Sequence, residues 1–146
     1  MTPTLTDDER RAIEADCERL IKHYVNLNDA QDWPAVAALY TGDAVFRRPS
    51  GGEPIEGREA ILASFLARPT RVQRHLMANV VVEVEDADHA RAFSAIVLYQ
   101  GDPAPTGELP ALSANSPLVG TFTDKLVRTS EGWRFAERAG GLDFRP

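Results

Sequence analysis

Four segments in the second half of the chain have the composition and periodicity of β-strands, and they constrain the fold most. They are 73–84, 89–100, 118–128 and 133–138. A side-chain period of two indicates strands, and the polar turns at 85–88 and 129–132 are typical of connections between antiparallel neighbours. We therefore predict a long antiparallel meander that forms the second half of the fold.

The first half of the chain has helical periodicity. Thr6 with Glu9 three residues later is a capping-box signature, and apolar residues at helical spacing follow it. Asp32 and Pro34 suit the first turn of a second helix, which the turn residues 41–43 would end. Helices are therefore predicted at about 7–29, 33–40 and 58–67, and strands at 44–48 and 55–56.

Helices gathered in the first half and antiparallel strands in the second half predict the α+β class. The meander is expected to curl around the three helices and to leave a cavity at its centre. A chain of 146 residues fits a single domain that spans 1–146. Segment 101–117 contains four prolines without clear periodicity, and we interpret it as a lid or an interface arm.

Composition excludes several classes of function. A net charge of −6 and a pI near 5.0 argue against a nucleic-acid partner. No apolar run approaches the roughly 20 residues of a membrane span or forms a signal peptide, so we expect a cytoplasmic protein without a membrane partner. Cys17 is the only cysteine, and the three histidines lack metal spacing. We therefore predict no metal and no cofactor.

Five short motifs stand in a fixed order along the chain: YTGDAVF at 40–46, EGREAI at 56–61, RH at 74–75, GTFTD at 120–124 and GWRF at 132–135. With the order of helices and strands, they resemble the nuclear transport factor 2-like superfamily, and most of all its SnoaL-like branch. The resemblance implies a cone: a curved, mixed or antiparallel sheet around three N-terminal helices, with a deep apolar pocket. That family includes dehydratases, isomerases, cyclases and non-enzymatic binding modules, so the fold alone does not determine the function.

The resemblance also assigns candidate catalytic positions. Ketosteroid isomerases carry their catalytic Asp at the position of Arg48, and a guanidinium cannot act as a general base. The isomerase's oxyanion tyrosine corresponds to Tyr24. Scytalone dehydratase and hexachlorocyclohexane dehydrochlorinase pair an Asp near the end of the first helix with a His at the start of the third strand. The matching residues are Asp29 and His75, whereas Asn28 replaces a scytalone dehydratase tyrosine.

An imidazole that is oriented by a carboxylate is a common general base. We therefore predict a catalytic dyad of His75 and Asp29 in a cofactor-independent lyase or isomerase of dehydratase-like chemistry. Its expected substrate is a hydrophobic cyclic or polyketide-like molecule. One alternative is a non-catalytic ligand-binding or assembly module, in which both side chains only satisfy local backbone groups. Another is a polyketide cyclase-like enzyme that uses Asp124, although cross-strand pairing of Asp124 with a basic residue is also open.

Further side chains are predicted to contact the substrate or to form core. They are Tyr24, Trp33, Phe46, Phe65, Met77, Tyr99, Phe122 and Arg138. Arg138 would hold an anionic group or form an ion pair at the surface or at the end of the sheet. Apolar Val80, Val82 and Val84 are expected on an exposed convex face of the sheet, which a second copy would cover in a homodimer or homotrimer.

Overall fold

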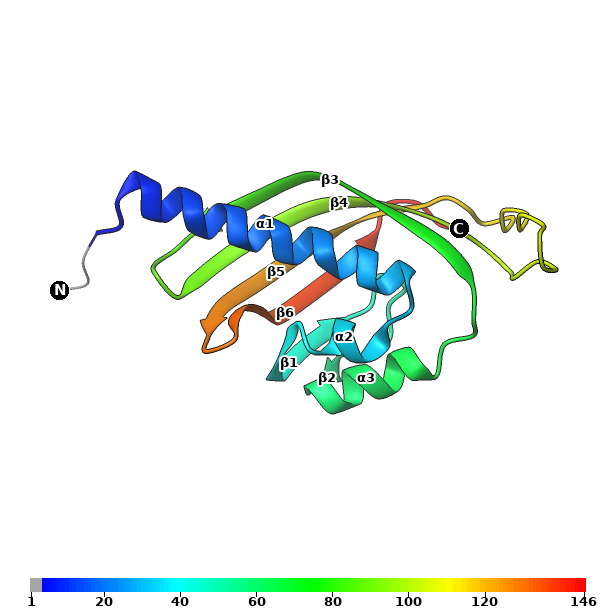
Figure 1. Cartoon of the computed structure of the whole chain (residues 1–146), viewed down its shortest axis with the longest axis horizontal. Coiled ribbons are helices and arrows are strands. Elements are labelled where there is room, and N and C mark those ends of the chain that lie inside the picture. Colours follow the sequence, from blue (N-terminus) through cyan, green and yellow to red (C-terminus); the bar gives the residue numbers. More distant parts are fainter. Residues whose placement is uncertain (1–3) are drawn as a thin grey trace.

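The computed structural model describes residues 4–146. In chain order its elements are α1 (Asp7–Asp29), α2 (Trp33–Ala37), β1 (Tyr40–Arg47), β2 (Ile55–Glu56), α3 (Arg58–Leu66), β3 (Val72–Val84), β4 (His89–Gly101), β5 (Leu118–Thr129) and β6 (Gly132–Leu142). α1 lies along the curved sheet, and α2 and α3 lie beside β1 and β2 (Figure 1). The predicted α+β class is confirmed.

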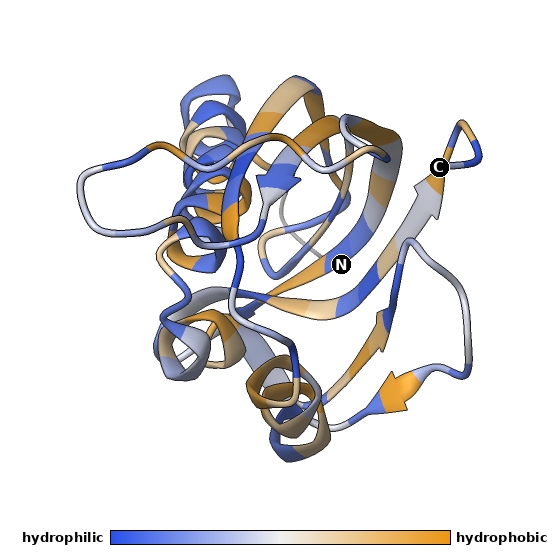
Figure 2. Ribbon diagram, turned by 90° about the vertical axis from the view of Figure 1, so that its right-hand side faces the viewer, coloured by the Kyte–Doolittle hydropathy of each residue, from blue (hydrophilic) through white to orange (hydrophobic). Residues whose placement is uncertain are grey.

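The six strands form one unclosed sheet in the order β2-β1-β6-β5-β4-β3. All neighbours are antiparallel except β1 and β6, which run parallel and pair Phe46 with Arg138. The sheet is therefore mixed, and its first long strand lies beside its last. Hydrophobic and hydrophilic positions alternate along the strands, so each strand presents two different faces (Figure 2).

The long first helix begins and ends where its sequence signals place it. The Thr6 side chain accepts a hydrogen bond from the Glu9 N–H, and the Glu9 carboxylate accepts one from the Thr6 N–H. Cys17 and Ile21, from the predicted apolar stripe, are fully buried. Burial of this stripe against β3 and β6 fixes the C-terminal end of α1, where the candidate site begins.

Two predicted boundaries are wrong. The second helix ends at Ala37, and 41–43 belong to β1 rather than to a turn, because Phe135 donates its N–H to the Leu39 carbonyl and draws this segment against β6. The last strand continues through Gly140 and Gly141 to Leu142. Gly140 is required by packing, since a Cβ there would lie 2.4 Å from Pro49 and 2.9 Å from Phe122.

The prediction that Val80, Val82 and Val84 lie on the outer face of the sheet is wrong. These side chains pack against the core beneath α1. A bulge between Ala78 and Val81, with Asn79 at a φ of 54°, shifts the alternation of β3 by one residue. Outer positions of β3 and β4 expose other apolar side chains, namely Leu76, Val81, Phe93 and Tyr99. This face is open in the single chain.

Within residues 4–146, no helix is both long enough and apolar enough to cross a membrane.

Candidate active site

A cavity of about 380 Å³ lies between the concave side of the sheet and the helices. Its lining comes from the three helices and from β1, β3, β4, β5 and β6. The loops between α1 and α2, between β1 and β2 and between α3 and β3 complete it. Predicted contact residues in this lining are Tyr24, Trp33, Phe46, Phe65 and Phe122. Trp33 and Phe65 stack with centroids 5.2 Å apart and planes 5° apart, which gives the cavity a flat aromatic wall.

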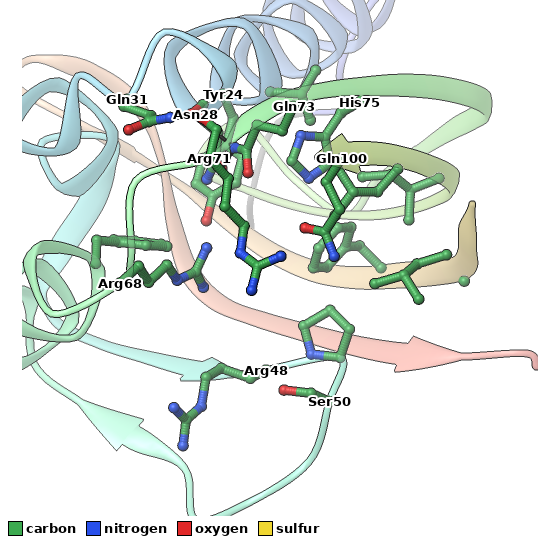
Figure 3. A pocket seen from close by; sticks show the side chains of 18 of the residues that line it. Tyr24, Asn28, Gln31, Arg48, Ser50, Arg68, Arg71, Gln73, His75 and Gln100 are labelled. Atoms are coloured by element: carbon green, nitrogen blue, oxygen red, sulfur yellow. Dashed lines mark hydrogen bonds between the residues drawn. The ribbon is translucent and has the colours of Figure 1, made fainter. Parts of the chain in front are cut away.

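Asp29 and His75 meet at the edge of this cavity. The carboxylate accepts the His75 backbone N–H at 2.8 Å through Oδ2, and its Oδ1 lies 2.5 Å from the ring Nδ1. An ionised carboxylate can only accept, so a neutral ring in this contact carries its proton on Nδ1 and keeps Nε2 as an acceptor. The Asp29 side chain is 3% exposed and the His75 side chain 13% exposed. His75 lines the cavity and its ring points into it (Figure 3).

Three amide side chains fix the surroundings of the dyad. The Gln73 amide nitrogen donates to the Asn28 carbonyl at 3.0 Å and to the Asn28 side-chain oxygen at 2.9 Å. Gln31 donates to the Arg71 carbonyl and has a φ of 57°, in the left-handed region. These hydrogen bonds join the end of α1 and the following loop to the start of β3. They therefore fix the backbone around Asp29 relative to the backbone around His75. No sequence pattern singled out Gln73 or Gln31.

Tyr24 brings a hydroxyl to the cavity wall. Its hydroxyl oxygen lies 2.7 Å from that of Tyr40, within buried surroundings. Burial raises the pKa of Tyr24, and it raises the pKa of Tyr40 well above the ordinary value. Both phenols are therefore neutral at pH 7. When Tyr40 donates to Tyr24, the Tyr24 proton can be donated to an oxygen atom in the cavity.

Asp124 and Arg138 form a pair in the core and not at the surface or at a sheet end. They are register partners on the inner face of β5 and β6, their side chains are 0% exposed, and Arg138 Nε lies 3.6 Å from Asp124 Oδ1. The guanidinium also lies over the rings of Tyr24, Phe122 and Phe135, at 4.4, 3.9 and 4.6 Å. Burial raises the pKa of Asp124 to about 6, against the opposing effect of Arg138.

Arg138, Met77 and Tyr99, also predicted as contact residues, lie outside the described cavity lining. Arg138 lies behind Tyr24 and Phe122, which themselves line the wall. Met77 packs against the core further along β3. Tyr99 is 37% exposed because its neighbours Leu98 and Gln100 point inward and the strand alternates. Asp124 is likewise absent from the lining, as is the whole of loop 102–117.

One side of the cavity is basic, which no sequence pattern indicated. Arg48, Arg68 and Arg71 belong to the lining, and Gln73 and Gln100 add amide groups. Arg68 and Arg71 lie in the connection between α3 and β3, where no periodicity marks which side chains point inward. Among residues 4–146, no group of three or more His, Cys, Asp or Glu side chains is arranged to hold a metal ion.

Comparison with known proteins agrees with this architecture. Residues 9–139 match the model of the SnoaL-like domain. The fold is similar to that of a provisionally assigned scytalone dehydratase from Novosphingobium aromaticivorans, with 19% identity, 95% of this chain and 89% of the other covered, and a TM-score of 0.79. It is also similar to a provisionally assigned dehydratase of the NTF2-like family from Streptomyces avermitilis, with 18% identity, coverage of 90% and 97%, and a TM-score of 0.77.

A third similar structure is a Catenulispora acidiphila protein crystallised in complex with S-DNPA, with 21% identity, coverage of 88% and 92%, and a TM-score of 0.70. No curated protein matches the chain. At these identities the solved structures establish the fold, and the family model spans most of the sequence. The chain therefore belongs to the SnoaL-like domain family, within the NTF2-like superfamily.

Proposed function

We propose that the chain is a cofactor-independent lyase or isomerase of dehydratase-like chemistry, with His75 as general base and Asp29 as the residue that orients it. One observation carries the proposal: the buried Asp29 carboxylate binds Nδ1 of an imidazole that lines the cavity. A base must present a free nitrogen to its substrate, and this contact leaves Nε2 free.

The proposed reaction begins when His75 Nε2 removes a proton from a carbon next to a carbonyl group. The electron pair moves onto the carbonyl oxygen, where the Tyr24 hydroxyl donates a hydrogen bond to the developing negative charge. When the enolate re-forms the carbonyl, the bond to a hydroxyl on the β-carbon breaks. The His75 imidazolium returns the proton to this hydroxyl, which leaves as water. In an isomerisation, the same proton is returned to another carbon.

The lining supports a hydrophobic ring compound as the substrate class. The cavity of about 380 Å³ is within the range of small-molecule sites, and aromatic side chains from five elements line it. The C. acidiphila relative was crystallised with a small molecule, which is consistent with small-molecule binding in this fold. Asp124 contributes less to the proposal because it lies outside the described lining and pairs with Arg138.

Proton abstraction can be measured before the natural substrate is identified. A panel of cyclic ketones and β-hydroxy ketones is incubated with the protein in D₂O, and NMR follows loss of the α-proton signal and appearance of alkene signals. Wild-type protein is expected to accelerate exchange or water loss, and His75→Gln is expected to reduce that rate by about 10²–10⁴-fold. Glutamine retains a hydrogen-bonding side chain beside Asp29 but is not a base.

His89→Gln is the matched control, because His89 is exposed and pairs with Asp86 away from the cavity. A His75→Gln variant with wild-type exchange rates would refute the general-base assignment. Binding of panel members without exchange in any of them would instead identify a ligand-binding module. Loss of activity in Asp124→Asn, with His75→Gln active, would favour the cyclase-like alternative.

We also propose that the chain is cytoplasmic and forms a homodimer or homotrimer through the open outer face of the sheet. Exposed Leu76, Val81 and Phe93 support this use of the face. Light scattering is expected to give a mass of two or three chains, and Phe93→Lys is expected to lower it to one. A wild-type mass of one chain at all concentrations would contradict the assembly.

A further inference from the structure

We propose, on the basis of the proposed function, that the substrate carries an oxyanion group, a carboxylate or a phosphate, which Arg68 and Arg71 bind at the mouth of the cavity. The ring system would then lie deeper in the cavity, within reach of His75 Nε2. This narrows the substrate class from a hydrophobic ring compound to an acidic one.

The charge of the lining is the first argument. Arg48, Arg68 and Arg71 line the cavity, and no Asp or Glu of the described chain is in the lining. The chain as a whole has a net charge of −6, so this positive region is opposite in sign to the rest of the molecule. A cavity that is lined by three arginines and by no carboxylate attracts anions and disfavours cationic ligands.

The lack of internal partners is the second argument. Within residues 4–146, no ion pair includes Arg48, Arg68 or Arg71. Arginines on the outside of the same sheet are paired: Arg47 with Glu137 at 3.3 Å and Arg91 with Glu85 at 3.2 Å. The cavity arginines therefore keep their guanidinium donors available for a ligand, and a planar guanidinium matches the two oxygens of a carboxylate or phosphate.

Contacts within the chain also hold the Arg68 side chain and the Arg71 backbone in place. The Arg68 guanidinium lies 4.4 Å from the Phe65 ring centroid and 5.9 Å from that of Trp33, so it packs against the stacked aromatic wall. The Arg71 carbonyl accepts a hydrogen bond from Gln31, which ties its backbone to the loop after α1. A ligand would therefore bind the Arg68 guanidinium with a smaller loss of side-chain entropy than a free surface arginine would require.

Figure 3 shows how these groups are arranged around the cavity. The guanidinium groups of Arg68 and Arg71 point toward the middle of the cavity, below the His75 ring, and the Gln100 amide faces them from the other side. Arg48 is turned toward the following turn, where its guanidinium lies close to Gly52. Arg68 and Arg71 are therefore the principal anion ligands, and Arg48 adds positive charge at the rim.

The Arg68 pKa is consistent with this arrangement. It is lowered from its ordinary value, first because the side chain is partly withdrawn from water; the charge of Arg48 also lowers it. Both causes disfavour a lone cation at this position, although the residue retains contact with solvent at the mouth. A bound oxyanion would offset both.

The test compares three probes that share the naphthalene ring: 2-naphthoate, 2-naphthyl phosphate and the neutral 2-naphthamide, which matches 2-naphthoate in shape. Binding is measured by isothermal titration calorimetry. At least one anion is expected to bind about tenfold or more tightly than the amide and to lose affinity as salt is added. The stronger of the two anions identifies a carboxylate or a phosphate as the preferred group.

Arg68→Gln and Arg71→Gln are each expected to weaken binding of the preferred anion by about tenfold and to leave the amide unchanged. Arg47→Gln is the matched control, because Arg47 is adjacent to Arg48 in sequence but pairs with Glu137 outside the cavity. Equal affinity for acid and amide, absence of binding by either anion at millimolar concentration, or insensitivity to both substitutions would overturn the proposal.

The anion site and the general base can be tested independently of each other. His75→Gln is expected to abolish proton exchange, whereas the preferred anion should still bind more tightly than the amide. Anion-selective binding together with full exchange activity in His75→Gln would retain the anion site and reject the dyad. Loss of exchange in His75→Gln, together with equal binding of anions and amide, would retain the dyad and reject the anion site.

Discussion

Replacing Asp124 by Asn is expected to remove a pH dependence of stability that the buried pair with Arg138 imposes. The pKa of Asp124 is raised from 3.8 to about 6, chiefly by burial. Between these two values the folded chain holds a proton that the unfolded chain has lost. The contribution of Asp124 is therefore fully present below about pH 4 and is lost as the pH rises through 6.

A shift of this size corresponds to about 3 kcal/mol, at about 1.4 kcal/mol for each pH unit. The 0% exposed side chain justifies use of the whole shift. Asparagine resembles the protonated acid at every pH and leaves Arg138 over its three aromatic rings. Near pH 4, wild type and Asp124→Asn should therefore differ by less than about 1 kcal/mol, whereas at pH 8 the variant should be more stable by about 3 kcal/mol.

Urea denaturation at a series of pH values measures this difference directly, because all other titrating groups are common to both proteins. Asp102→Asn provides the control, since Asp102 lies exposed in the loop after β4. Parallel stability profiles for wild type and Asp124→Asn would refute the reasoning. So would a variant that is less stable than wild type by a growing margin as the pH rises, because that would show an ionised pair that stabilises the fold.

Three other predictions concern the core. Tyr40→Phe removes the partner of the Tyr24 hydroxyl and should lower the free energy of unfolding by about 1–3 kcal/mol, as measured by urea denaturation. The double variant Tyr24→Phe/Tyr40→Phe should regain part of this loss. Additive losses of the two single variants would contradict a coupled pair. Gly120→Ala should lower the free energy of unfolding by at least about 1–3 kcal/mol, because its Cβ would lie 2.0 Å from the Gly141 carbonyl oxygen in β6. Gly42→Ala should lower it less, because a Cβ at Gly42 meets open space. Equal losses for the two variants would refute this explanation. The thiol of Cys17, fully buried with its pKa raised to about 12, should react with a disulfide reagent only after unfolding; rapid labelling of the folded chain would contradict its burial.

The sequence predicted those parts of the fold whose causes are local. The capping box and the apolar stripe determine the bounds of α1, and short polar turns separate β3 from β4 and β5 from β6. The end of α2 could not be predicted in this way, because Tyr40 leaves helical geometry in order to pair with β6 almost a hundred residues later. The predicted last strand stopped at residue 138, whereas β6 continues through Gly140 and Gly141, and close packing against Phe122 requires the first of them.

The candidate site depends on contacts between residues far apart in sequence. Asp29 and His75 are 46 residues apart, and only the family resemblance suggested that they meet. The burial of Arg138 with Asp124 depends on the register of β5 and β6, which a reading of either strand alone does not determine. Arg68 and Arg71 were missed because an irregular connection has no period from which the inward side can be inferred.

The most direct test of the central claim is the protonation state of the two His75 ring nitrogens, measured by long-range ¹H–¹⁵N correlation NMR on the neutral ring. We expect a proton on Nδ1, in the hydrogen bond to Asp29, and an unprotonated Nε2 that faces the cavity. Asp29→Asn is expected to disturb this tautomer, and His89 provides an internal comparison in the same spectrum. A neutral His75 ring with its proton on Nε2 would leave no free nitrogen for the substrate and would contradict the claim.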